Sequence, residues 1–378
     1  MGYESRSAIS SRKKAISLFV VFAACIALAF GLLVGCGTSS GSSGNAGKIT
    51  DAYGRTVELP KEVKSVATVG SGARIVVYAG GVDKLIAVTE METNAAPVRP
   101  YTIVYADTFS QLPTTSNGNH LMETSVDVEK MVELAPDVII SSRSAEECNQ
   151  LQEATKIPVV GVSYQDEVFG DDLMKSIEIV GTVLGTSDHA KSVVAKIKGW
   201  NDELAKLTSG IKDDQKPSVY VGSVNYKGAK GFTGTYGKFS VFTANGIKNV
   251  ADEKGVTGWF ETDLEQIGAW NPDYIFLNPA NKTLLNEEYA NNTAFFDGLK
   301  AIQGNQVYTL PAFNMNGTNA ELGICASYFT GATVYPEQFK SIDLAKKYDE
   351  ILETMLGKAC YEHLSQKGIV YGSMKLGE

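Results

Sequence analysis

The sequence has few of the residues that carry catalysis or hold metal ions. It contains three histidines, His120, His189 and His363, which lie far apart in the chain. It has no H-E-x-x-H or C-x-x-C pair of zinc ligands and no Walker loop for nucleotide phosphates. These absences argue against the common zinc peptidases and nucleotide hydrolases. An acid–base pair among the 43 acidic residues stays open, but no motif indicates catalysis.

Basic charge is also scarce. The chain has a net charge of −9, and residues 1–35 hold four of its basic residues and one of its acidic residues. The remainder therefore has 30 basic and 42 acidic residues, a net charge of −12. A protein that binds nucleic acid needs a basic face, so this balance argues against a nucleic-acid partner.

The N-terminus has the pattern of a targeting segment. Basic residues precede an almost wholly apolar run from Ala15 to Leu33, and Leu33-Val34-Gly35-Cys36 is similar to a bacterial lipobox. A plain transmembrane anchor is the alternative, because 19 apolar residues approach a membrane span. We favour a signal peptide over 1–35 and lipidation of Cys36, because a Gly/Ser linker follows up to residue 48. The folded part would then be lipid-anchored on the extracytoplasmic face of the cell membrane.

Three cysteines, Cys148, Cys325 and Cys360, lie beyond that segment. An odd number allows one disulfide with a free thiol, or three free thiols. The sequence leaves both alternatives open.

One sequence unit occurs twice, 136 residues apart. Residues 127–140 and 263–276 both begin with Asp-x-Glu and carry Pro-Asp before an apolar run. Apolar residues at helical spacing predict a short helix, which the proline ends. The following run of β-branched and aromatic residues predicts a buried strand. The use of one helix–turn–strand unit twice predicts two lobes of similar build.

Strand and helix patterns alternate in both halves, which predicts parallel sheets with helices on both faces. Between the repeated units, residues 171–207 carry the pattern of a long amphipathic helix with an interruption at Gly185. The predicted fold is α/β, with two Rossmann-like lobes bridged by a single long helix. The predicted lobes are 49–168 and 211–378, joined by a helical segment over 169–210. We expect 89–125 to be irregular, 335–356 to form one helix, and 369–371 to be a weak strand.

Loops after the predicted strands are rich in Tyr, Asn, Ser and Gly, with a few cations. Parallel sheets bind ligands at the carboxyl ends of their strands, where amides and helix N-termini act as donors. Such a lining suits a large ligand that is partly aromatic or anionic, although each residue also fits a solvated loop. The candidates are Ser71, Gly72, Arg74, Arg99, Tyr101, Tyr105, Arg143, Tyr226, Lys227, Tyr236, Asn278, Asn314 and Asn316.

Both repeated units place a glutamate, Glu129 or Glu265, in the first turn of the predicted helix. A carboxylate there offsets the helix dipole, and Thr262 with Glu265 matches a capping box. Capping alone would explain both residues. It would not require the same glutamate in each lobe, whereas a duplicated ancestor would.

These features together resemble the substrate-binding proteins of ABC importers for ferric siderophores, haem and vitamin B12. The likeness rests on Cys36, the first turn Val69-Gly70-Ser71-Gly72-Ala73, the two Asp-x-Glu units and the long central helix, and it covers about residues 49–356. It implies a ligand cleft between the lobes, modest closure on one rigid helix, and binding without catalysis or a cofactor. It also implies permease and ATPase partners, with Glu129 and Glu265 docking on permease arginines.

The resemblance implies a small metal chelate as ligand. A ferric chelate is the first expectation, with cobalamin and haem next. Siderophores with carboxylates usually need clustered arginines, and only Arg74, Arg99 and Arg143 are suitably placed. No His or Met is clearly poised as a haem ligand, although four of the candidate tyrosines would serve. A secreted enzyme or a lipoprotein sensor on the same scaffold is the alternative, since fold does not determine function.

Overall fold

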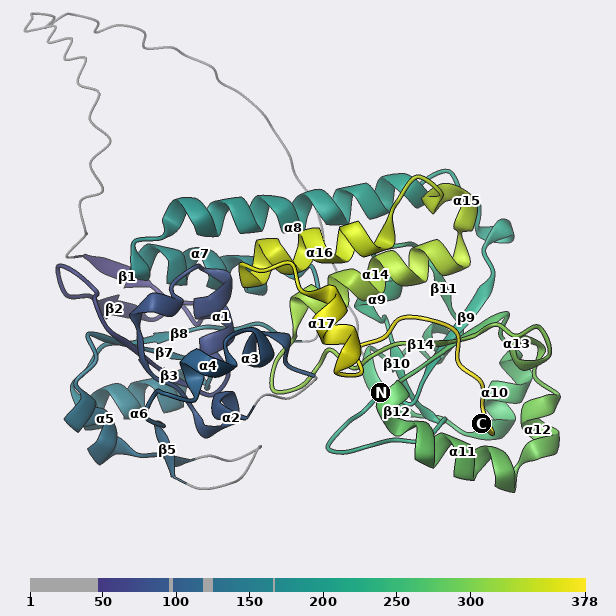
Figure 1. The fold of residues 1–378 in the computed structure, drawn as a ribbon, viewed down its shortest axis with the longest axis horizontal. Coiled ribbons are helices and arrows are strands. Elements are labelled where there is room, and N and C mark those ends of the chain that lie inside the picture. Colours follow the sequence, from purple (N-terminus) through teal and green to yellow (C-terminus); the bar gives the residue numbers. More distant parts are fainter. Residues whose placement is uncertain (1–46, 95–97, 118–124, 166) are drawn as a thin grey trace, which may run out of the picture. The chain divides into compact units, whose positions relative to one another are not determined.

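The computed structural model describes residues 47–378, apart from 95–97, 118–124 and 166. The predicted signal peptide, the predicted lipidation site Cys36 and His120 lie outside the described residues. These residues belong to one compact unit, in which two lobes are visible (Figure 1). None of the described helices is both long enough and apolar enough to cross a membrane. Cys148, Cys325 and Cys360 are buried free thiols, the second of the two alternatives above.

The first lobe is built on a sheet of four parallel strands. In sheet order these are β4 (Leu85–Ala87), β3 (Val66–Val69), β7 (Val138–Ser141) and β8 (Val159–Gly161). The central strands β3 and β7 are buried at every residue, which explains their continuous apolar runs. The other elements are the hairpin β1 (Lys48–Thr50) and β2 (Thr56–Glu58), α1 (Gly72–Tyr78), η1 (Val82–Lys84), α5 (Val128–Leu134) and α6 (Ala145–Thr155).

The expectation of an irregular stretch over 89–125 was wrong. The described part of this stretch contains α2 (Glu90–Thr93), α3 (Pro100–Val104), α4 (Ala106–Phe109) and the antiparallel pair β5 (Ser116–Asn117) and β6 (Ser125–Val126). Each helix spans at most five residues, which is too short to show an amphipathic period. The helices are ordered by tertiary packing, since Tyr101 and Phe109 are fully buried.

Two packed helices connect the lobes. The first, α7 (Asp171–Leu184), ends at Gly185, whose φ of +72° suits glycine. The second, α8 (Ser187–Thr208), has 22 residues and runs along both lobes (Figure 1). The predicted long helix with an interruption at Gly185 is therefore present as this pair.

The second lobe repeats the parallel sheet of the first. In sheet order its strands are β11 (Lys248–Asn249), β9 (Ser218–Gly222), β13 (Tyr274–Leu277) and β14 (Val307–Thr309). An antiparallel ribbon of β10 (Gly234–Gly237) and β12 (Gly258–Glu261) is added beside it. The short helices are η2 (Asp213–Gln215), α9 (Ser240–Thr243), η3 (Val250–Lys254), α10 (Leu264–Trp270), η4 (Pro279–Asn281), α11 (Lys282–Asn291), α12 (Thr293–Asp297) and α13 (Lys300–Gln303).

The C-terminal helices differ from the expectation in two places. The helix predicted over 335–356 is split into α15 (Pro336–Phe339) and α16 (Leu344–Leu356), because Asp343 caps a new helix by accepting from Lys346 N. Residues 369–371 are not a strand. Instead, Met374 N donates to Val307 O at 2.8 Å, so the tail covers the edge strand β14. The remaining helices are α14 (Ala320–Val334) and α17 (Tyr361–Gln366).

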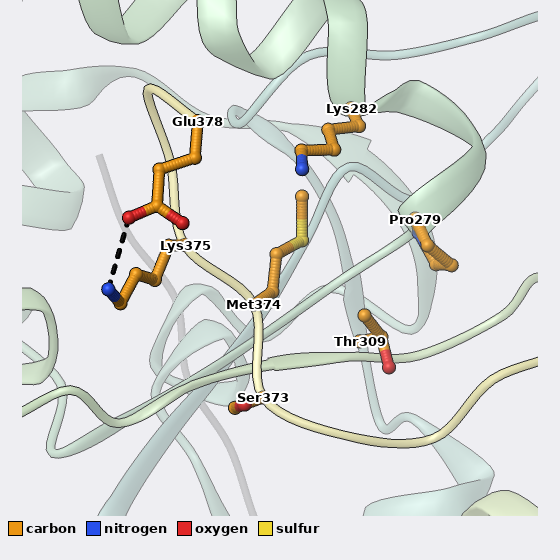
Figure 2. A pocket seen from close by; sticks show the side chains of 7 residues that line it. All are labelled: Pro279, Lys282, Thr309, Ser373, Met374, Lys375 and Glu378. Carbon is orange, nitrogen blue, oxygen red and sulfur yellow. Dashed lines mark hydrogen bonds and ion pairs between the residues drawn. The ribbon is translucent and has the colours of Figure 1, made fainter.

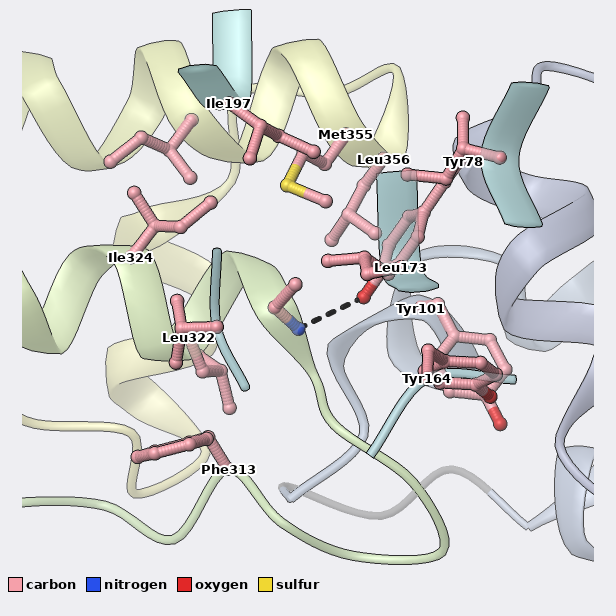
Figure 3. Close-up of a cluster of buried hydrophobic side chains, with 14 of the residues drawn as sticks. Tyr78, Tyr101, Tyr164, Leu173, Ile197, Phe313, Leu322, Ile324, Met355 and Leu356 are labelled. Atoms are coloured by element: carbon pink, nitrogen blue, oxygen red, sulfur yellow. Dashed lines mark hydrogen bonds between the residues drawn. The ribbon is translucent and has the colours of Figure 1, made fainter. Parts of the chain in front are cut away.

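One apolar core continues through both lobes. Figure 3 shows Tyr78 of the first lobe, Ile197 of α8, Leu322 of α14 and Met355 of α16 converging on it. The helix α14 is buried around nearly its whole circumference, which explains why it is apolar on all faces. A shared core opposes large movements of one lobe against the other, in keeping with the modest closure that we expect.

The two Asp-x-Glu units fold alike down to their hydrogen bonds. Asp127 and Asp263 cap α5 and α10 by accepting from the backbone N–H three residues later. Both helices end on a left-handed residue, Ala135 or Asn271. A Pro-Asp or Asn-Pro-Asp sequence follows each helix. Its aspartate, Asp137 or Asp273, accepts hydrogen bonds from backbone N–H groups at the start of the neighbouring strand. The predicted repetition of one unit in two lobes is thus present in detail.

The first of these carboxylates provides a test. Asp137 Oδ2 accepts from Lys64 N at 2.8 Å and from Ser65 N at 2.9 Å. We expect Asp137→Ala to lower the free energy of unfolding by about 1–3 kcal/mol, because two N–H groups lose their acceptor. Urea unfolding would measure the change, with the exposed Asp107→Ala as control. Equal effects of both variants would contradict the assigned role.

Candidate functional site

Turns of glycine and serine close the strands of the first lobe at their carboxyl ends. Gly70 follows β3 with a φ of +64°, and a Cβ there would lie 2.4 Å from Ser142 Oγ. Ser71 N donates to the same Ser142 oxygen at 2.8 Å, and the hydroxyl of Tyr164, after β8, donates to Ser71 O at 2.6 Å. The predicted residues Ser71 and Gly72 therefore lie where three parallel strands end.

Arg74, on α1, is completely buried. Its guanidinium donates to the carbonyls of Asn316 at 2.9 Å and Met315 at 3.1 Å, and to the Tyr164 hydroxyl at 3.1 Å. It also lies 4.9 Å from the ring centroid of Tyr101 and 5.6 Å from that of Tyr164. Burial acts to lower the pKa of Arg74, but the surrounding tyrosines hold it above its ordinary value. The structure thus brings Arg74, Tyr101 and Asn316 together, as a contact between the lobes.

A buried carboxyl group lies beside this arginine. Glu92 accepts from the Tyr101 hydroxyl at 2.9 Å and is also hydrogen-bonded to Thr89. Burial raises the pKa of Glu92, although both hydrogen bonds act in the other direction. Arg99 is buried as well and donates to the carbonyls of Met91 at 2.9 Å and Asn94 at 3.1 Å. The Arg99 Nη2 group and the Tyr101 hydroxyl, of residues both predicted to bind ligand, therefore have protein partners, while the buried Arg99 Nε has none among the described residues.

Two tyrosines of the first lobe are tied to the C-terminal helices. The Tyr78 hydroxyl is hydrogen-bonded to the carboxyl group of Glu321 and accepts from Ala320 N at 3.2 Å (Figure 3). Burial raises the pKa of Glu321, and the hydrogen bond from Tyr78 offsets part of this rise. Tyr105 donates its hydroxyl to Leu356 O at 2.8 Å. The predicted ligand residue Tyr105 is thus a lobe-to-lobe contact.

Of the three predicted arginines, Arg143 keeps an exposed part. Its side chain is 26% exposed and its Nη1 lies 3.6 Å from Glu147 Oε1. A Cβ placed on Gly70 would lie 3.8 Å from its Nε, so the side chain is beside the first strand turn. This position leaves Arg143 within reach of a ligand at the strand ends.

An exposed aromatic pair with two cations lies on the second lobe. Tyr226 is 46% exposed and stacks on Trp259, with ring centroids 4.6 Å apart and planes at 12°. Lys227 Nζ lies 5.5 Å from the Tyr226 ring centroid, and Lys230 Nζ lies 5.0 Å from that of Trp259. The Trp259 indole N–H donates to Val224 O at 2.9 Å, which fixes the ring. We call Tyr226, Lys227, Lys230 and Trp259 the aromatic platform.

A small hollow of about 40 Å³ adjoins the platform at the carboxyl ends of β9 and β13. Asn278, one of its lining residues, is 4% exposed and caps η4 by accepting from Ala280 N at 3.1 Å. Asn314 also lines it and accepts from the Thr318 hydroxyl at 3.1 Å. The full lining is 221–225, Phe239, Asn278 and 310–314, without a charged residue. The predicted residues Asn278 and Asn314 are thus brought together.

A larger open groove, of about 340 Å³, lies where the C-terminal tail passes β14 (Figure 2). It is lined by Pro279, Lys282, Thr309, Ser373, Met374, Lys375 and Glu378. Lys375 pairs with Glu378 at 3.0 Å, and Thr309 N donates to Gly372 O at 2.8 Å. This groove is the seam between the tail and the sheet edge, and no predicted site residue lines it.

Glu129 and Glu265 are exposed, each at the second position of its helix. The expected capping box of Thr262 with Glu265 was wrong, because Asp263 caps α10 by accepting from Gln266 N at 2.7 Å. An aspartate cap directly before the helix takes precedence over a threonine one residue earlier. Neither glutamate is therefore the cap of its helix.

Two members of the platform were not predicted from the sequence. Lys230 was not among the candidates, and Trp259 lies on β12, which was not predicted. The short aromatic run 259–260 after Gly258 was a usable signal for a strand that carries Trp259. Tryptophan is also rare in this chain, which has three, so each one is a candidate for a specific role. Tyr236 lies directly across the ribbon from Trp259 and packs 5.7 Å from Phe239.

Residues 75–312, more than half of the chain, match the family described as periplasmic binding protein. The chain belongs to this family. Two parallel-sheet lobes on a connecting helix pair agree with that membership. The resemblance to substrate-binding proteins of ABC importers is thereby confirmed at the level of the family and its fold.

Several known proteins are similar to this chain over most of its length. The uncharacterized ABC transporter substrate-binding lipoprotein YvrC of Bacillus subtilis is 23% identical over 337 residues, covering 84% of this chain and 97% of the relative. A periplasmic solute binding protein from Veillonella parvula has a TM-score of 0.67 and 20% identity, with 85% and 96% of the two chains covered. The molybdate-binding MolA of Haemophilus influenzae has a TM-score of 0.62 and 19% identity, with 82% and 98% covered.

The buried carboxyl group of Glu321 gives this periplasmic binding protein a testable pH dependence. Because its pKa is raised in the folded state, the folded protein binds more protons than the unfolded chain above the ordinary glutamate pKa. Stability should therefore fall as pH rises through the raised pKa. We expect Glu321→Gln to lose less stability than the parent protein between pH 5 and pH 8. Thermal unfolding would measure this, with the exposed Glu353→Gln as control; parallel curves for the parent and Glu321→Gln would contradict it.

Proposed function

We propose that this chain is the substrate-binding lipoprotein of an ABC importer, tethered outside the membrane, and that it captures a ferric chelate and delivers it to the permease. The family membership and the lipoprotein relative support the transport role. The ligand class rests on one observation, the aromatic platform. Chemistry at the site is limited to binding and release, and the ATPase of the importer supplies the energy for import.

The platform offers an exposed π surface with two lysines over it. Aromatic rings stack on such a surface, and lysine cations attract a ligand with negative charge. A ferric catecholate combines both features, because its rings are flat and its iron-bound oxygens carry negative charge. The chain is acidic overall, so these two clustered lysines form a local region of positive charge. Such a region favours an anionic ligand.

Haem is a weaker candidate on this geometry. A haem ligand would need a free tyrosine hydroxyl, but those of Tyr101 and Tyr105 are hydrogen-bonded to Glu92 and Leu356 O. The Tyr226 ring is already stacked on Trp259 beside Lys227, an arrangement that favours contact with a flat anionic ligand over axial ligation. These contacts support the proposal of a ferric chelate over haem.

A ligand screen of the mature protein tests the proposal directly. Trp259 lies in the platform, so its fluorescence should be quenched when a chelate stacks there. The screen would use a ferric tricatecholate, a ferric trihydroxamate, haem, cobalamin and molybdate. We expect the ferric tricatecholate to bind most tightly. Tighter binding of haem, cobalamin or molybdate would show that the proposed ligand is wrong. Catalytic turnover of any of these compounds would overturn the transport role.

The platform itself can be tested by substitution. We expect Tyr226→Ala to weaken binding of the ferric tricatecholate about fivefold to tenfold, because the aromatic stack and its cation–π contact contribute on the order of 1 kcal/mol. Tyr226→Phe keeps the ring and should bind within a factor of two of the parent protein. Fluorescence titration gives both affinities, and circular dichroism checks folding. Unchanged affinity in Tyr226→Ala would mean that this loop is a solvated surface without a role in binding.

Glu129 and Glu265 supply a separate test of delivery to the permease. Both are exposed at equivalent helix positions, as two matched contact points require. Charges at the rim of an interface mainly govern orientation and encounter rate, so each single Ala variant should reduce uptake in part. The double variant should abolish uptake while chelate affinity stays unchanged. Uptake of labelled iron in cells measures this, with the exposed Glu153→Ala as control; loss of chelate affinity would mean that these are cleft or fold residues.

A further inference from the structure

The hollow beside the aromatic platform contains a buried donor that the protein leaves unpaired. Asn278 Oδ1 accepts from Ala280 N at 3.1 Å, which fixes the orientation of the side-chain amide. Its Nδ2 is buried and has no hydrogen-bond partner in the described part of the chain. A buried amide donor without an acceptor is unfavourable, because it has lost its hydrogen bond to water. The site therefore favours any occupant that brings an acceptor to this nitrogen.

The walls of the hollow decide which kind of acceptor fits. Val221, Leu310 and Phe313 contribute apolar surface, and no lining residue is charged. A carboxylate would lose its hydration there without gaining a cation, which is strongly unfavourable. A neutral oxygen, such as that of an amide or ester carbonyl, has no such cost. The lining thus selects an uncharged acceptor on a small apolar group.

The size and position of the hollow limit the rest of the ligand. Its volume of about 40 Å³ is a few times the roughly 10–15 Å³ that a cavity needs for one water molecule, so it admits one small group. Val224 lines the hollow and its carbonyl accepts from the Trp259 indole at 2.9 Å. The hollow and the aromatic platform are therefore neighbours, and one ligand would contact both.

We propose that the hollow is a subsite for a neutral carbonyl-bearing arm of the ligand, with Asn278 Nδ2 donating to the carbonyl oxygen. This proposal rests on the proposed function for the remainder of the ligand. The ring and negative charge of the ligand lie on the platform, while its neutral arm enters the hollow. Chelates that join catechol rings through amide linkers have both parts, whereas free catechol has only the first. Asn278 would then determine selectivity between the two.

A fragment experiment tests the subsite without any chelate. The probes are N-methylacetamide, which is neutral, and acetate, which is anionic, each added at millimolar concentrations to the mature chain. The readout is the Asn278 side-chain NH₂ resonance in asparagine-labelled protein, assigned by its loss in Asn278→Asp. We expect N-methylacetamide to shift this resonance saturably and acetate to leave it unchanged. No shift with N-methylacetamide, or an equal shift with acetate, overturns the subsite.

A second experiment uses two ferric chelates, one of a bis(catechoyl amide) and one of catechol. Asn278→Asp keeps the oxygen that caps Ala280 N and removes the donor. It should weaken the amide chelate at least tenfold and the catechol chelate less than twofold, with Asn278→Ser intermediate because its hydroxyl can donate. Equal losses for both chelates, or none, would overturn the subsite. If neither chelate binds the parent protein while the fragment shift is present, the ferric-chelate function fails and the subsite stands.

Discussion

The buried guanidinium of Arg74 is the contact on which the arrangement of the two lobes depends. A charge taken out of water is costly unless hydrogen bonds and neighbouring π faces compensate for it. Here the compensation comes from both lobes, since Tyr101 and Tyr164 belong to the first and the carbonyls of Met315 and Asn316 to the second. Separation of the lobes at this point would deprive the cation of its two carbonyl acceptors. The turn at 315–317 is therefore held against the strand ends of the first lobe.

The duplicated unit shows which parts of the fold both lobes need. The aspartate cap, the left-handed residue and the carboxylate that ties the helix end to the next strand occur in both copies. These contacts explain the repeated Asp and Pro-Asp positions by stability alone. The repeated glutamates have no capping role, because Asp127 and Asp263 already cap the helices; in the first turn they still offset the helix dipole. An exposed pair without a capping role is what a two-point contact with a partner would require.

Sequence patterns predicted the parts of the fold that depend on local periodicity. The strands at 138–141 and 159–161 and the helix at 145–155 have a continuous apolar or amphipathic pattern that local residues determine. The helices of four or five residues after residue 89 have no such pattern, and packing of Tyr101 and Phe109 orders them. The burial of Arg74 and Arg99 was equally beyond local reasoning, since an arginine looks the same in sequence whether its acceptors are water or distant carbonyls. Trp259 lies on the antiparallel ribbon of β10 and β12, where it stacks on Tyr226. No turn motif in the sequence predicted this ribbon.

These burials shift the expected recognition from the first lobe to the second. Arg74, Arg99, Tyr101 and Tyr105 have protein partners, so they shape the junction between the lobes and leave little for a ligand to contact. Within the residues that the structure describes, the first lobe keeps unpaired Nε atoms on Arg74 and Arg99, but the second lobe presents the exposed ring of Tyr226, two lysines and an unpaired amide donor within one neighbourhood. A ligand gains most binding free energy where polar groups of the free protein lack hydrogen-bond partners, because each contact with the ligand then supplies a missing partner. Selectivity should therefore follow the chemistry of the second lobe, while the first lobe, held by Arg74, supplies a fixed wall opposite it.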